Sequence, residues 1–125
     1  MGGTTSTGSE LDKLRGQTIE AYALGDAERA AGLYVDDGVQ QPPGRPPAVG
    51  RDAIRETYNM LFGRGGLSLR MEPWQTVVGE QEARERGAYH LAAGEQTLVV
   101  GKYMSVMARS DDGEWRYVWS TVTPD

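Results

Sequence analysis

The chain has 125 residues, with 18 acidic and 13 basic side chains, a net charge of −5 and no cysteine. Its length predicts one domain with a core of its own, because domains of roughly 100 to 150 residues are the commonest. The lack of cysteine excludes a disulfide framework, a thiolate metal site and a cysteine nucleophile. Acidic and basic residues are interspersed, so neither nucleic acid nor a membrane surface is an expected partner.

The first segment of the chain is rich in Gly and Thr and lacks the basic and apolar regions of a signal peptide. No apolar stretch approaches the roughly 18 residues that a membrane span requires. We therefore expect a cytoplasmic protein. Residues 1–9 also hold too few apolar side chains to offset the entropy of ordering, which predicts a disordered segment there and a single domain over residues 10–125.

Three helices are predicted in the first half of the chain. Apolar residues recur at helical spacing over residues 10–24, and Gly25 ends this helix. Asp26 can cap a short second helix that runs to residue 34. The helical spacing returns over residues 51–62, where a glycine-rich segment stops it.

Strands dominate the second half. A first strand is predicted at Val35–Gln41, before the proline-rich loop 42–47, whose prolines cannot donate ladder hydrogen bonds. From Leu67 onward the sequence alternates, with breaks near Gly79, residues 93–95 and residues 111–113, which predicts four strands joined by hairpin turns. The helices thus precede most of the strands along the chain. This order predicts an α+β domain, with helices on one face of a mostly antiparallel sheet.

Six short strings, in this order, resemble the NTF2-like superfamily and within it the SnoaL-like or ketosteroid-isomerase-like small domains. They are Ala21–Asp26, Leu33–Val39, Pro42–Gly44, Gly50–Arg55, Gly101–Tyr103 and Asp112–Arg116. The resemblance implies an NTF2-like cone: three N-terminal helices across the open side of a curved sheet, enclosing a pocket. This fold hosts isomerases, cyclases, hydrolases, dehydratases and plain binding modules, so it does not by itself fix a function.

From this resemblance we expect a small cofactor-independent enzyme of secondary metabolism that binds an apolar, oxygenated metabolite. Its expected chemistry is acid–base catalysis, such as isomerisation, cyclisation or epoxide opening. The alternative is a non-catalytic ligand-binding or dimerisation module of the same fold.

The residues that act in ketosteroid isomerases are replaced in this chain. In those enzymes an Asp removes a proton next to a carbonyl, while a Tyr and a protonated Asp stabilise the enolate. The resemblance matches the base to Gln41, whose amide has no useful basicity, the Tyr to Thr18 or Tyr22, and the second Asp to a position near Ser105. Gln41 is expected to point into the pocket and polarise a substrate carbonyl, or else to satisfy loop backbone.

Tyrosines supply the other candidate site residues. Tyr22, Tyr58 and Tyr103 come from the first helix, the third helix and a late strand, which the fold implied by the resemblance brings around one cavity. A phenol is both an aromatic wall and a hydrogen-bonding group, and Tyr103 is the expected acid or oxyanion donor. The register that the resemblance suggests for the last strand adds Val118 and Ser120 to the pocket.

His90 is the only histidine and so a candidate proton-transfer group near neutral pH. Its alternation with Tyr89 and Leu91 instead favours the opposite sheet face and a surface or interface role. No metal or cofactor is expected, because no spacing of ligand residues matches a metal motif. The Asp36–Asp37 pair is interpreted as a cap that pairs with an Arg such as Arg51.

Three aromatic residues, Trp115, Tyr117 and Trp119, alternate on the last strand. If Val118 and Ser120 face the pocket, this row faces outward and exposes an apolar patch. Such a patch is typical of an interface and predicts a homodimer through the sheet face. The opposite register would place Trp115 and Trp119 in the cavity.

Overall fold

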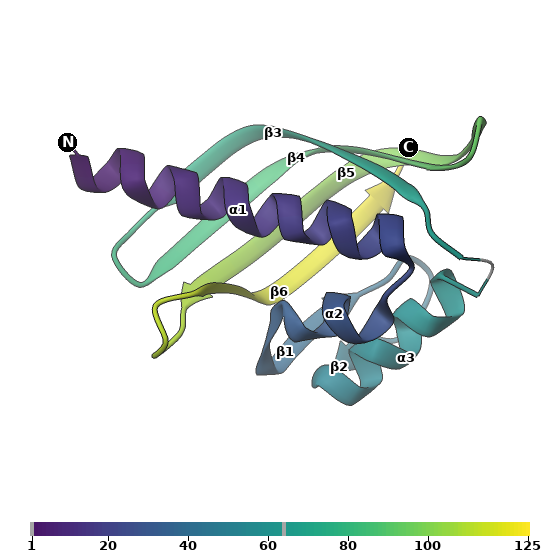
Figure 1. Cartoon of the computed structure of the whole chain (residues 1–125), viewed down its shortest axis with the longest axis horizontal. Coiled ribbons are helices and arrows are strands. Elements are labelled where there is room, and N and C mark those ends of the chain that lie inside the picture. The colour runs from purple at the N-terminus through teal and green to yellow at the C-terminus, as the bar shows by residue number, and fades with distance from the viewer. Residues whose placement is uncertain (1, 64) are drawn as a thin grey trace.

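The computed structural model describes residues 2–63 and 65–125, with the backbone alone for residues 2–9. Three helices and six strands follow one another along the chain (Figure 1). They are α1 (Gly2–Leu24), α2 (Ala27–Gly32), β1 (Tyr34–Gln41), β2 (Ala48–Val49), α3 (Arg51–Leu61), β3 (Ser68–Val78), β4 (Glu82–Ala93), β5 (Gln96–Arg109) and β6 (Trp115–Pro124).

The first helix begins at Gly2, earlier than the predicted start at Glu10. The side chains of residues 1–9 lie outside the described part of the structure, so the disordered segment expected there stays a prediction. Within the residues that the structure describes, no helix is both long and apolar enough to cross a membrane.

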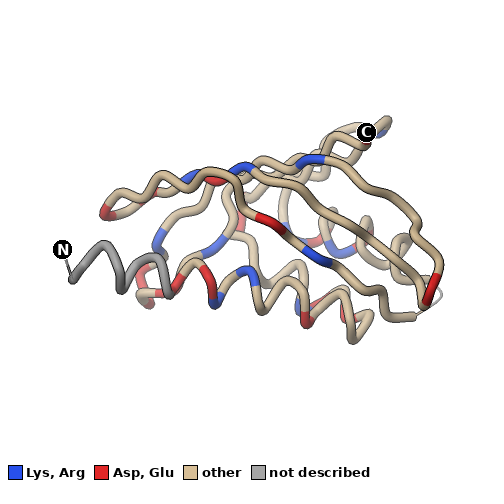
Figure 2. Tube along the Cα trace, turned by 90° about the horizontal axis from the view of Figure 1, so that it is seen from above, with Lys and Arg blue, Asp and Glu red and all other residues tan. Residues whose placement is uncertain are grey.

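All six strands form one sheet in the order β2-β1-β6-β5-β4-β3. The β1–β6 pair is parallel and every other described pair is antiparallel. The sheet is curved and stays open, and α1 crosses its concave side (Figure 1), with the sheet arching over the helix in the perpendicular view (Figure 2). The predicted α+β class and the mostly antiparallel sheet are therefore confirmed.

The core lies between the helices and the concave face of the sheet. Helix α2 contributes a face of small residues, Ala27, Ala30 and Ala31, all buried, which lets it approach its neighbours closely. In α3, Ile54 is 0% exposed, and it anchors that helix over the sheet. Fully burying an aliphatic side chain of this size stabilises the fold by about 2 kcal/mol.

The Asp36–Asp37 pair lies in β1, and its predicted arginine partner is confirmed. The guanidinium Nη1 of Arg51 lies 2.9 Å from Oδ1 of Asp36, while Arg51 Nε donates to the carbonyl oxygen of Tyr34 at 2.8 Å. Because Asp36 is largely exposed, the pair fixes the start of α3 against β1 and adds little stability through its charges.

In the last strand, the aromatic side chains do not all lie on the sheet face that was predicted for them. Tyr117 pairs with Met107 and Trp119 with the preceding residue Val106, so Val118 is the extra residue of a β-bulge. The bulge inverts the alternation: Trp115 and Tyr117 are buried, at 4% and 6% exposure, while Trp119 lies on the other face. The prediction that all three face outward is wrong, and so is the alternative that placed Trp119 in the cavity.

Candidate functional site

A cavity of about 430 Å³ lies between the helices and the concave face of the sheet. All six tyrosines of the chain line it, and they come from six different elements: Tyr22, Tyr34, Tyr58, Tyr89, Tyr103 and Tyr117. The volume falls within the range of small-molecule sites, which are mostly apolar with a few oriented polar groups. The fold thus collects every phenol of the chain around one hollow.

Exposed residues that line the cavity mark its mouth. They include Gln41 at the end of β1, Pro43 and Arg45 in the loop that follows, and Met60 and Leu61 at the end of α3, the last two 60% and 40% exposed. Arg45 is the only charged residue in the lining formed by the described residues. No carboxylate or imidazole of the described residues therefore contacts the cavity directly.

The helical wall of the cavity is an aromatic cluster. The ring of Tyr22 packs edge-on against Tyr58 at 5.6 Å between centroids and against Phe62 at 5.1 Å. On the sheet side, the rings of Tyr34 and Tyr117 lie 5.3 Å apart. Such pairs stabilise beyond their buried area, so these rings form a preorganised surface rather than a loose lining.

Two glycines on the sheet make room for tyrosine rings. Gly87 pairs with Tyr103 across the β4–β5 ladder, and a Cβ at Gly87 would lie 2.8 Å from Cε1 of that ring. Gly101 pairs with Tyr89 in the same ladder, where a Cβ would lie 2.9 Å from Cε1. Each ring thus lies over a cross-strand glycine, which positions its hydroxyl at the cavity.

A row of polar residues crosses the concave face between these aromatic positions. Each member pairs with the next across the strands β1, β6, β5, β4 and β3: Gln40, Ser120, Ser105, Glu85 and Thr76. The row includes Gln40 rather than Gln41, because Gln40 pairs with Ser120 while Gln41 pairs with Thr121. Gln41, predicted to point inward, is exposed and lies at the mouth.

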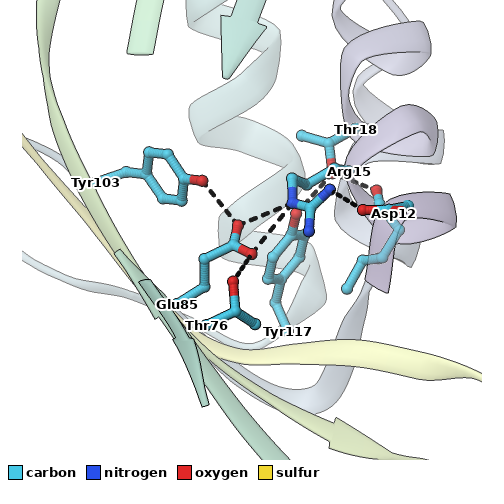
Figure 3. Close-up of polar contacts among 8 residues, drawn as sticks. Asp12, Arg15, Thr18, Thr76, Glu85, Tyr103 and Tyr117 are labelled. Atoms are coloured by element: carbon cyan, nitrogen blue, oxygen red, sulfur yellow. Dashed lines mark hydrogen bonds and ion pairs between the residues drawn. The ribbon is translucent and has the colours of Figure 1, made fainter. Parts of the chain in front are cut away.

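Within this row, the carboxylate of Glu85, only 4% exposed, accepts four hydrogen-bond contacts (Figure 3). Arg15 Nε of α1 donates to both oxygens at 3.0 and 3.1 Å, and Thr76 Oγ1 donates to Oε1 at 2.9 Å. The hydroxyl of Tyr103 donates to Oε2 at 2.7 Å. Glu85 does not line the cavity, but Tyr103 does, so the phenol connects the buried carboxylate to the cavity.

Burial and hydrogen bonding fix the charge states of this network. Burial alone would lower the pKa of Arg15, but its hydrogen bonds to Glu85 and Asp12 outweigh that effect and raise it. Burial, reinforced by the Glu85 carboxylate, raises the pKa of Tyr103. Arg15 therefore stays a cation and Tyr103 a neutral phenol at neutral pH.

A second hydroxyl pair lies where α1 meets β6. Thr18 Oγ1 donates to the carbonyl oxygen of Leu14 at 2.9 Å and lies 2.8 Å from the hydroxyl of Tyr117. Because Thr18 has one hydroxyl proton, both bonds form only when Tyr117 is the donor to Thr18. Burial raises the pKa of Tyr117, as it does for the other five tyrosines, so the cavity presents phenols and no phenolate.

The structure gathers most of the predicted site residues around the cavity. Those that line it are Thr18, Tyr22, Gln41, Tyr58, Tyr103, Ser105 and Ser120. Val118 lies in the bulge and is absent from the lining. His90 pairs with Arg70 on the opposite sheet face, and its Nε2 lies 3.1 Å from Oγ1 of Thr97. This placement agrees with the surface role considered for His90. The imidazole, a candidate catalytic group, therefore lies away from the cavity.

Sequence reasoning missed Gln40, Glu85, Tyr34, Tyr89 and Tyr117 as site residues. For Glu85 a signal was present: it shares its strand face with Ala83, Gly87 and Tyr89, and a lone carboxylate among such neighbours indicates a buried, partnered acid. Tyr117 could not be placed, because the bulge at Val118 has no sequence signature.

An open, curved sheet with helices across its concave side and a cavity between them defines an NTF2-like domain. Solved structures confirm this fold over nearly the whole chain. An NTF2-like protein with a cystatin-like fold from Novosphingobium aromaticivorans aligns with a TM-score of 0.78 at 22% identity, covering 91% of this chain and 79% of that one. A ketosteroid isomerase-like protein from Erwinia carotovora atroseptica has a TM-score of 0.76 at 23% identity, with coverage of 93% and 94%. A protein of unknown function from Mycobacterium tuberculosis, Rv3472, has a TM-score of 0.88 at 21% identity, with coverage of 98% and 73%.

The SnoaL-like domain family matches residues 16–118, which include all three helices in part or whole and every strand at least in part. The chain belongs to the SnoaL-like domain family.

Proposed function

We propose that this chain is a small cofactor-independent enzyme that binds an apolar, oxygenated metabolite in the tyrosine-lined cavity and catalyses acid–base chemistry on it. Isomerisation, cyclisation and epoxide opening are the reaction types that such chemistry covers. The observation that supports a catalytic role is the 2.7 Å hydrogen bond from the Tyr103 hydroxyl to Oε2 of Glu85. It connects a group at the cavity wall to a buried proton acceptor.

The proposed mechanism is a two-proton relay. The oxygen of Tyr103 accepts a proton from a substrate hydroxyl, or from a carbon next to a carbonyl, while the phenolic proton of Tyr103 moves to Oε2 of Glu85. Reversal of both transfers delivers the proton to a different substrate atom, which completes an isomerisation with no net change in protonation. Concerted transfer avoids a phenolate, which burial disfavours at this position.

Other residues assist this relay without exchanging protons. Arg15 and Thr76 hold the carboxylate of Glu85 and act as positioning residues. At the mouth, the amide of Gln41 is placed to donate a hydrogen bond to a substrate carbonyl, which would acidify the neighbouring carbon. Hydrogen bonds that are already oriented cost little reorganisation during the reaction.

The second candidate function is non-catalytic ligand binding. It is favoured by the absence of any Asp, Glu or His from the cavity lining of the described residues. A carrier needs the apolar hollow and its oriented hydroxyls but no proton acceptor in contact with the ligand.

One experiment separates the two functions. The purified protein is incubated with extract of its source cells, the retained compound is identified by mass spectrometry, and its conversion is followed with fresh protein. As an enzyme, the wild type converts the compound, and Tyr103→Phe binds it but turns it over at least about 100-fold more slowly. Tyr89→Phe, which removes a hydroxyl from the same wall outside the Glu85 network, keeps at least half of the activity. A compound that stays unchanged with every variant identifies a carrier.

We also propose a homodimer through the convex face of the sheet. Of the three aromatic residues predicted at this interface, only Trp119 lies on the convex face and would contact the second copy. Trp119 pairs with Val106 on that face, and Met104, which precedes Val106 on the same face, is 52% exposed. Sedimentation at micromolar concentration tests this: the wild type is expected as a dimer and Met104→Glu as a monomer. A monomeric wild type contradicts it.

A cytoplasmic location, supported by the lack of cysteine, and a role in secondary metabolism are further parts of the proposed function.

A further inference from the structure

The proline-rich loop after β1 places an arginine at the mouth of the cavity. Four prolines in the segment 42–47 fix their own φ angles, which limits the freedom of the loop that carries Arg45. Nη1 of Arg45 lies 3.4 Å from Sδ of Met60 at the end of α3, and both residues line the cavity. The guanidinium therefore lies at the rim of the cavity, between the loop and α3.

The charge of Arg45 is available to a ligand. Six other arginines of the described chain pair with carboxylates: Arg15, Arg29, Arg51, Arg55, Arg109 and Arg116. No carboxylate of the described residues pairs with Arg45, and the thioether of Met60 that it contacts is only a weak acceptor. A guanidinium presents five N–H donors in a planar fork that matches a carboxylate, so most of its donors remain for one.

The rest of the lining determines which charge a ligand can carry and where. The described residues contribute no Asp, Glu, Lys or His to the lining, while buried aliphatic and aromatic side chains such as Leu91 and Tyr58 form much of it. An anion among these groups would be desolvated and unpaired, which is costly, so an anionic group is stabilised only at the rim beside Arg45. Aromatic rings can also hold a cation, but Arg45 would repel one at the entrance.

We propose that the cavity takes ligands with an apolar ring body and a carboxylate, the ring body filling the interior and the carboxylate pairing with Arg45 at the mouth. Neutral analogues of the same shape fit the interior but lack the charge-assisted hydrogen bonds to the guanidinium. The inference names the ligand class of the proposed function and rests on the binding part of it. It does not depend on turnover.

Binding of two matched probes tests the proposal in the wild-type protein. The probes are para-phenylbenzoate, which is an anion at neutral pH, and para-phenylbenzamide, which is neutral; both are small enough for a cavity of about 430 Å³. Titration calorimetry at low salt is expected to give a dissociation constant for the benzoate about fivefold lower than for the benzamide, the size expected of an ion pair at a partly exposed site. Equal affinities, tighter binding of the benzamide, or no binding of the benzoate overturns the proposal.

Variants at Arg45 assign the preference to this residue. Arg45→Gln removes the charge, so the preference for the benzoate is expected to fall to within about twofold while the benzamide still binds. Arg45→Glu places a like charge at the rim and is expected to invert the preference in favour of the benzamide. Arg29→Gln, at an exposed position of α2 outside the cavity lining, is the matched control and should keep the wild-type preference.

Results at these variants are decisive in either direction. A preference for the benzoate that persists in Arg45→Gln or Arg45→Glu shows that another group recognises the carboxylate. An equal loss in Arg29→Gln shows that the preference comes from the net charge of the protein; each of these results overturns the proposal. Thermal unfolding of each variant establishes that it is folded. If the preference depends on Arg45 but the cellular compound is never converted, the proposed catalysis fails while this inference stands.

Discussion

The ring of Tyr103 lies over Gly87 across the β4–β5 ladder, and its hydroxyl donates to Oε2 of Glu85 at 2.7 Å. This relationship joins a backbone feature, the missing Cβ of a glycine, to the position of a cavity hydroxyl. It makes the cavity wall sensitive to changes on the sheet that do not touch a ligand.

Replacing Gly87 with Ala is expected to displace the Tyr103 ring. The added Cβ would also overlap the carbonyl oxygen of Glu72, so β3 must move as well. We expect a loss of about 2 kcal/mol in the free energy of unfolding, and ligand affinity at least about tenfold weaker. Urea denaturation and calorimetry measure the two effects. Unchanged stability and affinity would show that the ring does not depend on this glycine.

Gly16→Ala is expected to stabilise the chain. Gly16 lies inside α1 with open space around its hypothetical Cβ, so the alanine gains helix propensity without a clash. The expected gain is about 0.5 to 1 kcal/mol in the free energy of unfolding, measured by urea denaturation. It also serves as the matched glycine control for Gly87→Ala, and destabilisation here would contradict the position of α1.

Glu85→Gln is expected to destabilise the fold strongly. The change leaves the guanidinium of Arg15, 18% exposed, without its buried counter-charge. Removing one partner of a buried ion pair costs about 3 kcal/mol. Glu82→Gln, at an exposed position of the same strand, should change stability by less than about 0.5 kcal/mol and is the control. A similar small effect in both variants would mean that the Glu85 network contributes little.

Alkaline pH is expected to unfold the protein together with tyrosine ionisation. Burial raises the pKa of all six tyrosines in the folded state. Such groups stabilise the fold fully below the ordinary tyrosine pKa of about 10, and this stability is lost as the pH rises towards the raised values. Phenolate absorbance and circular dichroism should therefore change in a single transition above pH about 10. Ionisation of all six phenols near their ordinary pKa in a protein that stays folded would show that they are solvated.

The outline of the fold was predictable from the sequence because local patterns specify it. Helical periodicity, the proline-rich loop and the hairpin breaks set the positions of α2, α3 and β3 to β6. The fold implied by the family resemblance placed Tyr22 of α1, Tyr58 of α3 and Tyr103 of β5 around one cavity, and all three line it.

Side-chain direction failed in two strands. A bulge at Val118 in β6 inverts the alternation, which misplaced Trp115 and Tyr117. In β1 the prediction chose the wrong face, because Gln40 shares the alternation of Tyr34 and both line the cavity. Bulges arise from pairing with a distant strand, so no local pattern reveals them. The burial of Glu85 had a signal in its own strand, but its partners Arg15 and Tyr103 could not be assigned because they lie far from it in sequence.

A crystal structure of the protein with the compound that it retains from its source cells is the most direct test of the whole account. We predict the compound between α1, α3 and the concave sheet face, in contact with the hydroxyl of Tyr103. A compound bound on the convex face, or an interior filled by side chains with no room for a ligand, would contradict it.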